Sequence, residues 1–121
     1  MGTVALKEAY EAKSKDFMCE LVAPAITQMQ EAIDAEGALL SMDLRGNSKE
    51  LFNSRIQFMQ LFALTEALAE DKDIEAIDLS FNFIDDAGAA SLGNLLQRNT
   101  SLKYLNLAGN NIGREGAAKL A

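Results

Sequence analysis

The second half of the chain repeats a pattern of apolar positions at a fixed displacement. Residues of the same kind recur 28 positions apart, and the agreement includes asparagine and glycine as well as leucine and isoleucine. Unrelated apolar runs rarely agree at such positions, so the pattern indicates an internal repeat. The matching pairs are Ile74 and Leu102, Ile77 and Leu105, Leu79 and Leu107, Asn82 and Asn110, Ile84 and Ile112, Gly88 and Gly116, and Leu92 and Leu120.

Each copy predicts a strand, a turn and a helix. Ile77 and Leu79 alternate as in a short strand, whereas Gly88, Leu92 and Leu96 follow one helical face. Such a unit cannot bury its apolar face alone, so the next unit must cover it. We expect parallel, adjacent strands near residues 40–44, 76–79 and 104–107, and helices over about 24–35, 57–69 and 87–97.

An asparagine follows each predicted strand. Asn47, Asn82 and Asn110 stand where the chain must turn from the strand toward the helix. A side-chain amide at such a turn satisfies backbone groups that no strand partner reaches. We therefore assign these three residues a structural role in the turn rather than a catalytic one.

A longer unit precedes the two regular ones. Leu39, Met42 and Leu44 followed by Asn47 give the same strand pattern, but the distance from Leu39 to Ile74 is 35 residues. The extra residues fall around 48–54. They either lengthen the connection between strand and helix or form a binding loop, since loops on rigid scaffolds often carry function.

The N-terminal part lacks a strand motif and predicts two helices, over about 3–20 and 24–35. The ends of stacked repeats need an atypical covering unit, so we expect residues 1–36 to form an N-terminal helical cap that includes a degenerate first unit. In register, Met29 and Ile33 would occupy the places of Leu92 and Leu96. Residues 37–121 then form the repeats, about two and a half units with the last one truncated.

The motif LKYLNLAGNNIGREG at 102–116 resembles the leucine-rich-repeat family, and the 28-residue length resembles its ribonuclease-inhibitor-like class. This resemblance implies an α/β solenoid with short parallel strands on the concave face and helices on the convex face. The segments LSMDLRGN at 40–47 and IDLSFNFIDDAG at 77–88, together with the helical cap, are similar to the leucine-rich-repeat-containing protein thirty-four group. That similarity implies a place in a ciliary or flagellar assembly.

The amino-acid composition excludes several kinds of catalytic and metal site and several classes of partner. The 121 residues include no histidine and one cysteine, Cys19, which excludes histidine-based triads, histidine-ligated metal sites and an intrachain disulfide. The net charge of −7 opposes nucleic-acid binding and favours basic partners. We see neither a secretory signal nor an apolar run of the roughly 20 residues that span a bilayer. We expect no cofactor, no resident metal and a cytoplasmic location, including the cilium or the flagellar axoneme.

Two surfaces are candidates for partner binding. Residues that flank the inward leucines predict three lanes across the concave face: Ser41, Ala76 and Tyr104; Asp43, Asp78 and Asn106; and Arg45, Ser80 and Ala108. Asp43 and Asp78 would lie side by side and repel unless Arg45 or a basic partner stands between them. The second candidate is the pair Phe81 and Phe83, which either forms an exposed contact or packs under the insertion around Phe52.

These features favour a non-catalytic protein-interaction module, an intracellular scaffold of a cytoskeletal or ciliary assembly. The alternative is a regulator of a small GTPase, for which Arg45 and Arg114 would be the candidate residues. An enzyme using Asp43 and Asp78 as an acid–base pair ranks below both. The sequence ends within the last predicted helix, so the open C-terminal edge either continues into further repeats or docks on another chain.

Overall fold

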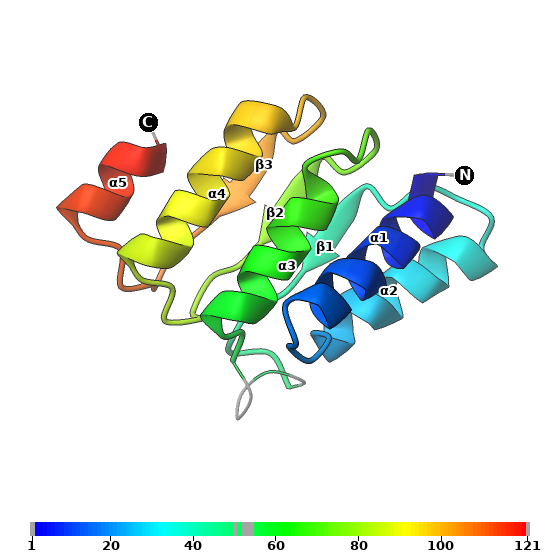
Figure 1. Cartoon of the computed structure of the whole chain (residues 1–121), viewed down its shortest axis with the longest axis horizontal. Coiled ribbons are helices and arrows are strands. Elements are labelled where there is room, and N and C mark those ends of the chain that lie inside the picture. The colour runs from blue at the N-terminus through cyan, green and yellow to red at the C-terminus, as the bar shows by residue number, and fades with distance from the viewer. Residues whose placement is uncertain (1, 50, 52–54, 121) are drawn as a thin grey trace.

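A three-stranded parallel sheet, with strand order β1-β2-β3, carries a row of helices on one face. The computed structural model describes residues 2–49, 51 and 55–120. In Figure 1, α3 and α4 lie side by side in front of the sheet, α5 continues their row on the left beyond α4, and α1 extends it toward the N-terminal end. The elements are α1 (Gly2–Asp16), α2 (Ala23–Asp34), β1 (Ser41–Asp43), α3 (Phe58–Leu68), β2 (Ala76–Asp78), α4 (Asp86–Arg98), β3 (Tyr104–Asn106) and α5 (Arg114–Leu120).

The strands pair in the predicted register. Ser41 is paired with Ala76, and Ala76 with Tyr104, while Asp43, Asp78 and Asn106 form a second row two residues further on. Between these rows, Met42 and Ile77 point inward and are buried. The period-2 alternation of a strand therefore separates a lane of core residues from two lanes on the open face of the sheet.

The N-terminal helices are placed differently from the expected register. α1 packs against α3, whereas α2 packs against β1 and α1. The helix that continues the convex row is therefore α1, although the sequence predicted this position for α2. α1 also ends at Asp16 rather than near Glu20, because Met18 adopts a left-handed backbone with φ of 54°, which stops a right-handed helix.

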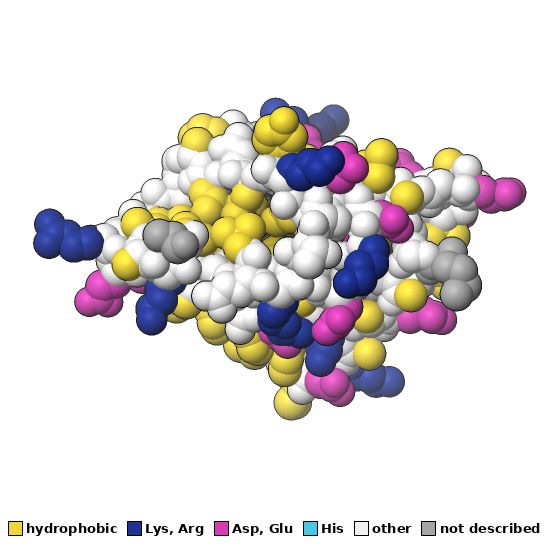
Figure 2. All heavy atoms as spheres, turned by 90° about the horizontal axis from the view of Figure 1, so that it is seen from above, with side chains coloured by type: hydrophobic (Ala, Val, Ile, Leu, Met, Phe, Trp, Pro, Cys, Tyr) yellow, Lys and Arg dark blue, Asp and Glu magenta, His cyan; other side chains and the backbone are white. Residues whose placement is uncertain are grey.

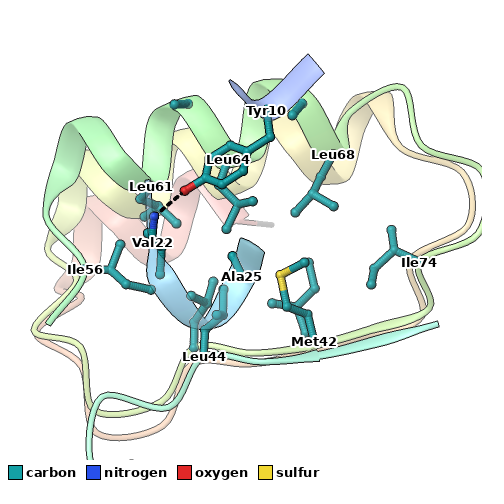
Figure 3. Packing of buried hydrophobic residues seen from close by; sticks show 14 of the residues in the cluster. Tyr10, Val22, Ala25, Met42, Leu44, Ile56, Leu61, Leu64, Leu68 and Ile74 are labelled. Carbon is teal, nitrogen blue, oxygen red and sulfur yellow. Dashed lines mark hydrogen bonds between the residues drawn. The ribbon is translucent and has the colours of Figure 1, made fainter. Parts of the chain in front are cut away.

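The core lies between the sheet and the helices, and Tyr10 of α1 reaches into it (Figure 3). Tyr10, Met29 and Leu44 are completely buried, at 0% exposure. The Tyr10 hydroxyl accepts a hydrogen bond of 2.7 Å from the backbone N–H of Val22, the residue before α2. Burial raises the pKa of this phenol above its ordinary value. This bond fixes the entry of α2 onto the core and satisfies the polar end of a buried aromatic ring.

The edge of β1 is covered by a side chain instead of a strand. The Gln28 side chain donates to the Asp43 carbonyl at 2.7 Å and accepts from the Asp43 N–H at 2.8 Å. One amide thus imitates the two hydrogen bonds of a neighbouring strand. Exposed strand edges invite pairing with other chains, so Gln28 from α2 blocks the N-terminal edge of the sheet.

The opposite edge is more open. The apolar residues of the last unit pack against the core but are only partly buried, and Figure 2 shows uncovered hydrophobic side chains on the α5 side of the molecule. These residues are Leu102, Leu105, Leu107, Ile112 and Leu120.

In the described part of the chain, every helix is too short or too polar to cross a lipid bilayer.

Candidate protein-interaction surfaces

Two of the three predicted turn asparagines form a ladder that joins successive units. Asn82 donates to the carbonyls of Leu44 and Leu79, at 2.7 and 3.1 Å, and its Oδ1 accepts from the Ile56 N–H at 3.2 Å. Asn110 repeats the pattern one unit later: it donates to the Leu79 carbonyl and accepts from the N–H groups of Asn82 and Ile84. These amides are occupied by backbone groups, which supports their structural role.

Asn47 departs from this pattern. Asn82 is 2% exposed, whereas Asn47 is an exposed residue. Asn82 and Asn110 each bond backbone groups of the unit before them, whereas β1 is the first strand of the sheet, so Asn47 has no preceding strand turn to close. The prediction that Asn47 closes a turn like the other two is not supported. Of the predicted insertion at 48–54, residues 50 and 52–54 lie outside the described residues.

A second polar ladder occupies the opposite edge, where helices lead back into strands. Asn99 donates to the carbonyls of Leu68 and Asp71, at 2.7 and 3.0 Å, and accepts from the Leu102 N–H at 2.7 Å. Asp71 accepts from the Ile74 N–H at 2.8 Å in the same way one unit earlier. These two positions are 28 residues apart, the displacement of the sequence repeat, but no role was predicted for them. The sequence pattern that could have predicted this ladder is a polar residue three positions before the first apolar residue of each strand motif, a spacing that suits an Asx turn.

The open face of the sheet is hollowed. A hollow of about 690 Å³ crosses all three strands and is lined by the first two predicted lanes, by Arg45 of the third lane and by the inward residues between the first two. Tyr104 is 72% exposed at one side of this hollow. Its lining residues are Ser41, Met42, Asp43, Arg45, Ala76, Ile77, Asp78, Tyr104, Leu105 and Asn106.

The acidic lane is organised by its own backbone. Asp43, Asp78 and Asn106 each accept a hydrogen bond from the N–H two residues further on, at 3.2, 3.0 and 3.0 Å. Asp43 also accepts from Arg45 Nε at 2.9 Å. Partial burial raises the pKa of the Asp43 carboxyl, but the hydrogen bonds and charge of Arg45 outweigh it, so the pKa lies below its ordinary value. Arg45, one of the two cations considered for the space between Asp43 and Asp78, is thus paired with Asp43.

Ser80 differs from the prediction that it faces a partner. It is 2% exposed, and its hydroxyl donates to Asp78 Oδ1 at 2.6 Å. A short hydroxyl side chain turns back onto the neighbouring carboxylate, whereas Arg45 and Ala108, its counterparts in the third lane, are exposed. Ser80 therefore orients Asp78 and is not itself presented on the surface.

Phe81 and Phe83 are exposed, at 44% and 60%, on either side of the buried Asn82. Both have left-handed backbones, with φ of 60° and 58°. Gly109, the counterpart of Phe81, has φ of 70°, and the Phe81 ring lies against its Cα, where a β-carbon would collide with it. The Arg55 guanidinium lies 4.3 Å from the centre of the Phe83 ring. Phe52, the proposed cover, lies outside the described residues.

The other candidates are separated in the fold. Arg45 follows β1 and is paired with Asp43, whereas Arg114 is an exposed residue at the start of α5, two units away. The structure does not bring these two arginines together, and a role as a regulator of a small GTPase stays a prediction.

Cys19 is partly buried against the core. Among the described residues, no group of three or more cysteine or carboxylate side chains is arranged to hold a metal ion.

Comparison with known proteins agrees with this architecture. Residues 72–93 and 98–121 match a family model described as Leucine Rich repeat, and these segments contain the two regular units of the sequence repeat. The chain folds as a leucine-rich-repeat solenoid. The search of curated proteins gave no significant match.

A solved structure shares the leucine-rich-repeat fold. It is titled "Leiomodin-1 Actin-Binding Site 2 (ABS2)", superposes with a TM-score of 0.63 and is 19% identical in sequence. The match covers 78% of this chain and 51% of that one, so the chain spans about half the length of the solved structure. At this level of identity the likeness establishes the fold.

Proposed function

We propose that the chain is a non-catalytic protein-interaction module that binds its partner on the concave face of the sheet. The observation that carries the proposal is the hollow of about 690 Å³, which is built from equivalent positions of three successive units. Repeat proteins present extended concave surfaces of this kind to other proteins. The surface is formed by regular strands, so its side chains are held at fixed spacing before a partner arrives.

The side chains that line the hollow are of types suited to binding a protein partner. Tyr104 offers a large exposed ring with a polar end, a residue type enriched at binding hot spots. Asp43 and Asp78 are oriented by hydrogen bonds to their own backbone. Side chains ordered in advance lose less conformational entropy on binding, which favours affinity. The carboxylates select a partner with basic groups opposite them.

The cytoskeleton is the proposed context. The leiomodin structure, which shares the fold, is titled an actin-binding site, and the resemblance to the protein thirty-four group implies ciliary assemblies. The 28-residue repeat supports the ribonuclease-inhibitor-like class within leucine-rich repeats. A cytoplasmic location, in the cilium or flagellar axoneme, follows from this proposal.

The proposal is tested by co-sedimentation with filamentous actin and, separately, with microtubules. We expect the chain to pellet with one of the two polymers and the Tyr104→Ala variant to lose at least tenfold in affinity. Asn94→Ala, an exposed change on the convex helix α4, is the matched control and should bind normally. Failure to pellet with either polymer contradicts the cytoskeletal context. Equal losses for both variants, with folding intact, contradict the concave face as the contact.

A further inference from the structure

A second apolar surface lies along the edge where strands lead into helices. Five large apolar side chains are exposed there: Met18 at 92%, Phe58 at 45%, Met59 at 40%, Phe81 at 44% and Phe83 at 60%. They come from the end of α1, the start of α3 and the turn before α4. We name this set the aromatic–methionine edge. Exposed apolar groups gathered in one region mark interaction sites more often than single scattered ones.

Three of these residues have backbone angles that large side chains seldom adopt, so fold stability alone does not account for their presence. Met18, Phe81 and Phe83 all have φ between 54° and 60°, a region that favours glycine and asparagine over large residues. The next unit has Gly109 and Asn111 at the positions of Phe81 and Phe83. Strained conformations that persist at large, exposed residues point to a function of those residues.

The rings are held in place although they are exposed. Phe81 lies against Gly109, and Phe83 lies under the Arg55 guanidinium at 4.3 Å. Phe58 stacks on Phe62, with 6.1 Å between the ring centres. These contacts fix the orientation of the rings while leaving a large part of each uncovered, as in a preorganised contact surface.

Two hollows run side by side along this edge. One, of about 260 Å³, is lined by the apolar residues Ile56, Phe58, Phe83 and Ile84. The other, of about 550 Å³, is lined by Met18, Cys19 and Met59. Both are also lined by Arg55 and Gln57, so they adjoin each other along the molecule.

We infer that the aromatic–methionine edge binds a basic amphipathic helix of a partner protein, with one apolar side chain seated in each hollow. Helices dock in this way when anchors on one face meet consecutive hollows, and methionine adapts to varied anchors. Each hollow is also lined by one carboxylate: Glu20 in one and Asp85, the N-cap of α4, in the other. Together with the net charge of −7, they favour basic groups flanking the anchors. This surface is separate from the concave hollow and does not depend on it.

The probe is a fluorescein-labelled Leu/Lys peptide of about 18 residues, five helical turns, with leucines on one face. A peptide of the same composition with the leucines scrambled and a Leu/Glu peptide are the comparisons. Affinity is followed by fluorescence anisotropy, and the site is mapped by NMR chemical-shift changes. We expect the Leu/Lys peptide to bind at least tenfold more tightly than both comparisons, with shift changes concentrated at the five edge residues.

The decisive variant is Phe83→Asn, because asparagine tolerates the left-handed backbone of position 83 better than phenylalanine does. We expect Tm to stay the same or rise, because strain is relieved, and peptide affinity to fall at least tenfold. Leu96→Ala, an exposed apolar change on α4, is the matched control and should bind normally.

Four outcomes overturn the inference. A large drop in Tm for Phe83→Asn would show that the ring is structural, and unchanged affinity would remove the edge as the site. Equal binding of the Leu/Glu peptide would refute the basic partner. Concentration-dependent dimers that the same substitution abolishes would make a second copy of the chain the occupant.

Discussion

The two ends of the sheet are built from the same repeat but finished in opposite ways. At the N-terminal end, α1 and α2 cover the core, and the Gln28 amide occupies the backbone groups of β1. At the other end, Leu107 is only partly buried, whereas its counterpart Leu79 is 1% exposed. The comparison shows that the exposure of a side chain in a repeat protein depends on the neighbouring units that cover it as much as on its own unit.

Leucine truncation should show the largest difference between these positions. Leu79→Ala removes a fully buried side chain and should lower the free energy of unfolding by about 3 kcal/mol, within the range for core leucines. Leu107→Ala should lower it by about half as much, because part of the side chain is already in water. Urea denaturation followed by circular dichroism measures both values.

Protein concentration is the control for this pair. At a concentration where the chain is monomeric, equal losses for Leu79→Ala and Leu107→Ala would contradict the open edge. If the Leu107→Ala loss grows as concentration rises, the edge is covered by self-association, because stability then depends on the concentration of the protomer.

Removing the amide that closes the N-terminal edge should have a smaller effect. Gln28→Ala leaves the N–H and carbonyl of Asp43 to water, so we expect a loss of about 1 kcal/mol. It should also make β1 available for pairing with other chains, which size-exclusion chromatography with light scattering detects. Gln97→Ala, a change of the same type on α4, should leave both stability and mass unchanged. A monomer with unaltered stability would show that Gln28 does not protect this edge.

The smallest expected effect concerns the ion pair beside that edge. Arg45→Ala should raise the pKa of Asp43 toward its ordinary value, because its largest favourable hydrogen bond is lost. In the wild type this pair stabilises the fold above the ordinary carboxylate pKa, and the contribution disappears as the pH falls through the lowered pKa. NMR titration of the Asp43 side chain measures the shift.

Stability itself should change by less than about 0.5 kcal/mol in Arg45→Ala, since the pair is exposed. Lys7→Ala, which removes an ion pair with Glu11 on α1, is the control and should leave the Asp43 titration unchanged. An Asp43 pKa that Arg45→Ala leaves unchanged would show that the ion pair does not hold it below its ordinary value.

Much of the regular part of the fold could be predicted from sequence. The 28-residue displacement, joined with period-2 alternation, was enough to place β2 and β3 and to align Ala76 with Tyr104. For Phe81 and Phe83 the sequence left two alternatives open, an exposed contact or packing under the insertion, and the structure leaves both rings exposed. Repetition makes such predictions strong because each unit tests the alignment of the other.

The irregular parts could not be predicted in the same way. An apolar stripe shows that α1 is amphipathic but not which helix it covers, so its place beside α3 was missed. Gln28 carries no pattern, because its role depends on a strand end brought to it by the tertiary fold. Ser80 follows the lane spacing yet turns onto Asp78, since a short hydroxyl finds the nearest acceptor. Asn47 follows the first strand, so it lacks the preceding strand unit that Asn82 and Asn110 each close.

In the asparagine ladder each amide bonds to the unit before it in the sequence, and this order affects folding during synthesis on the ribosome. The turn after β2 is completed by Asn110, and the connection into α3 is completed by Asn82, so each unit is closed by an amide that lies downstream in the sequence. A ribosome releases residues in order, from the N-terminus onward. Each turn therefore stays unfinished until the following unit has left the exit tunnel, and the folded boundary trails the growing end of the chain by one repeat.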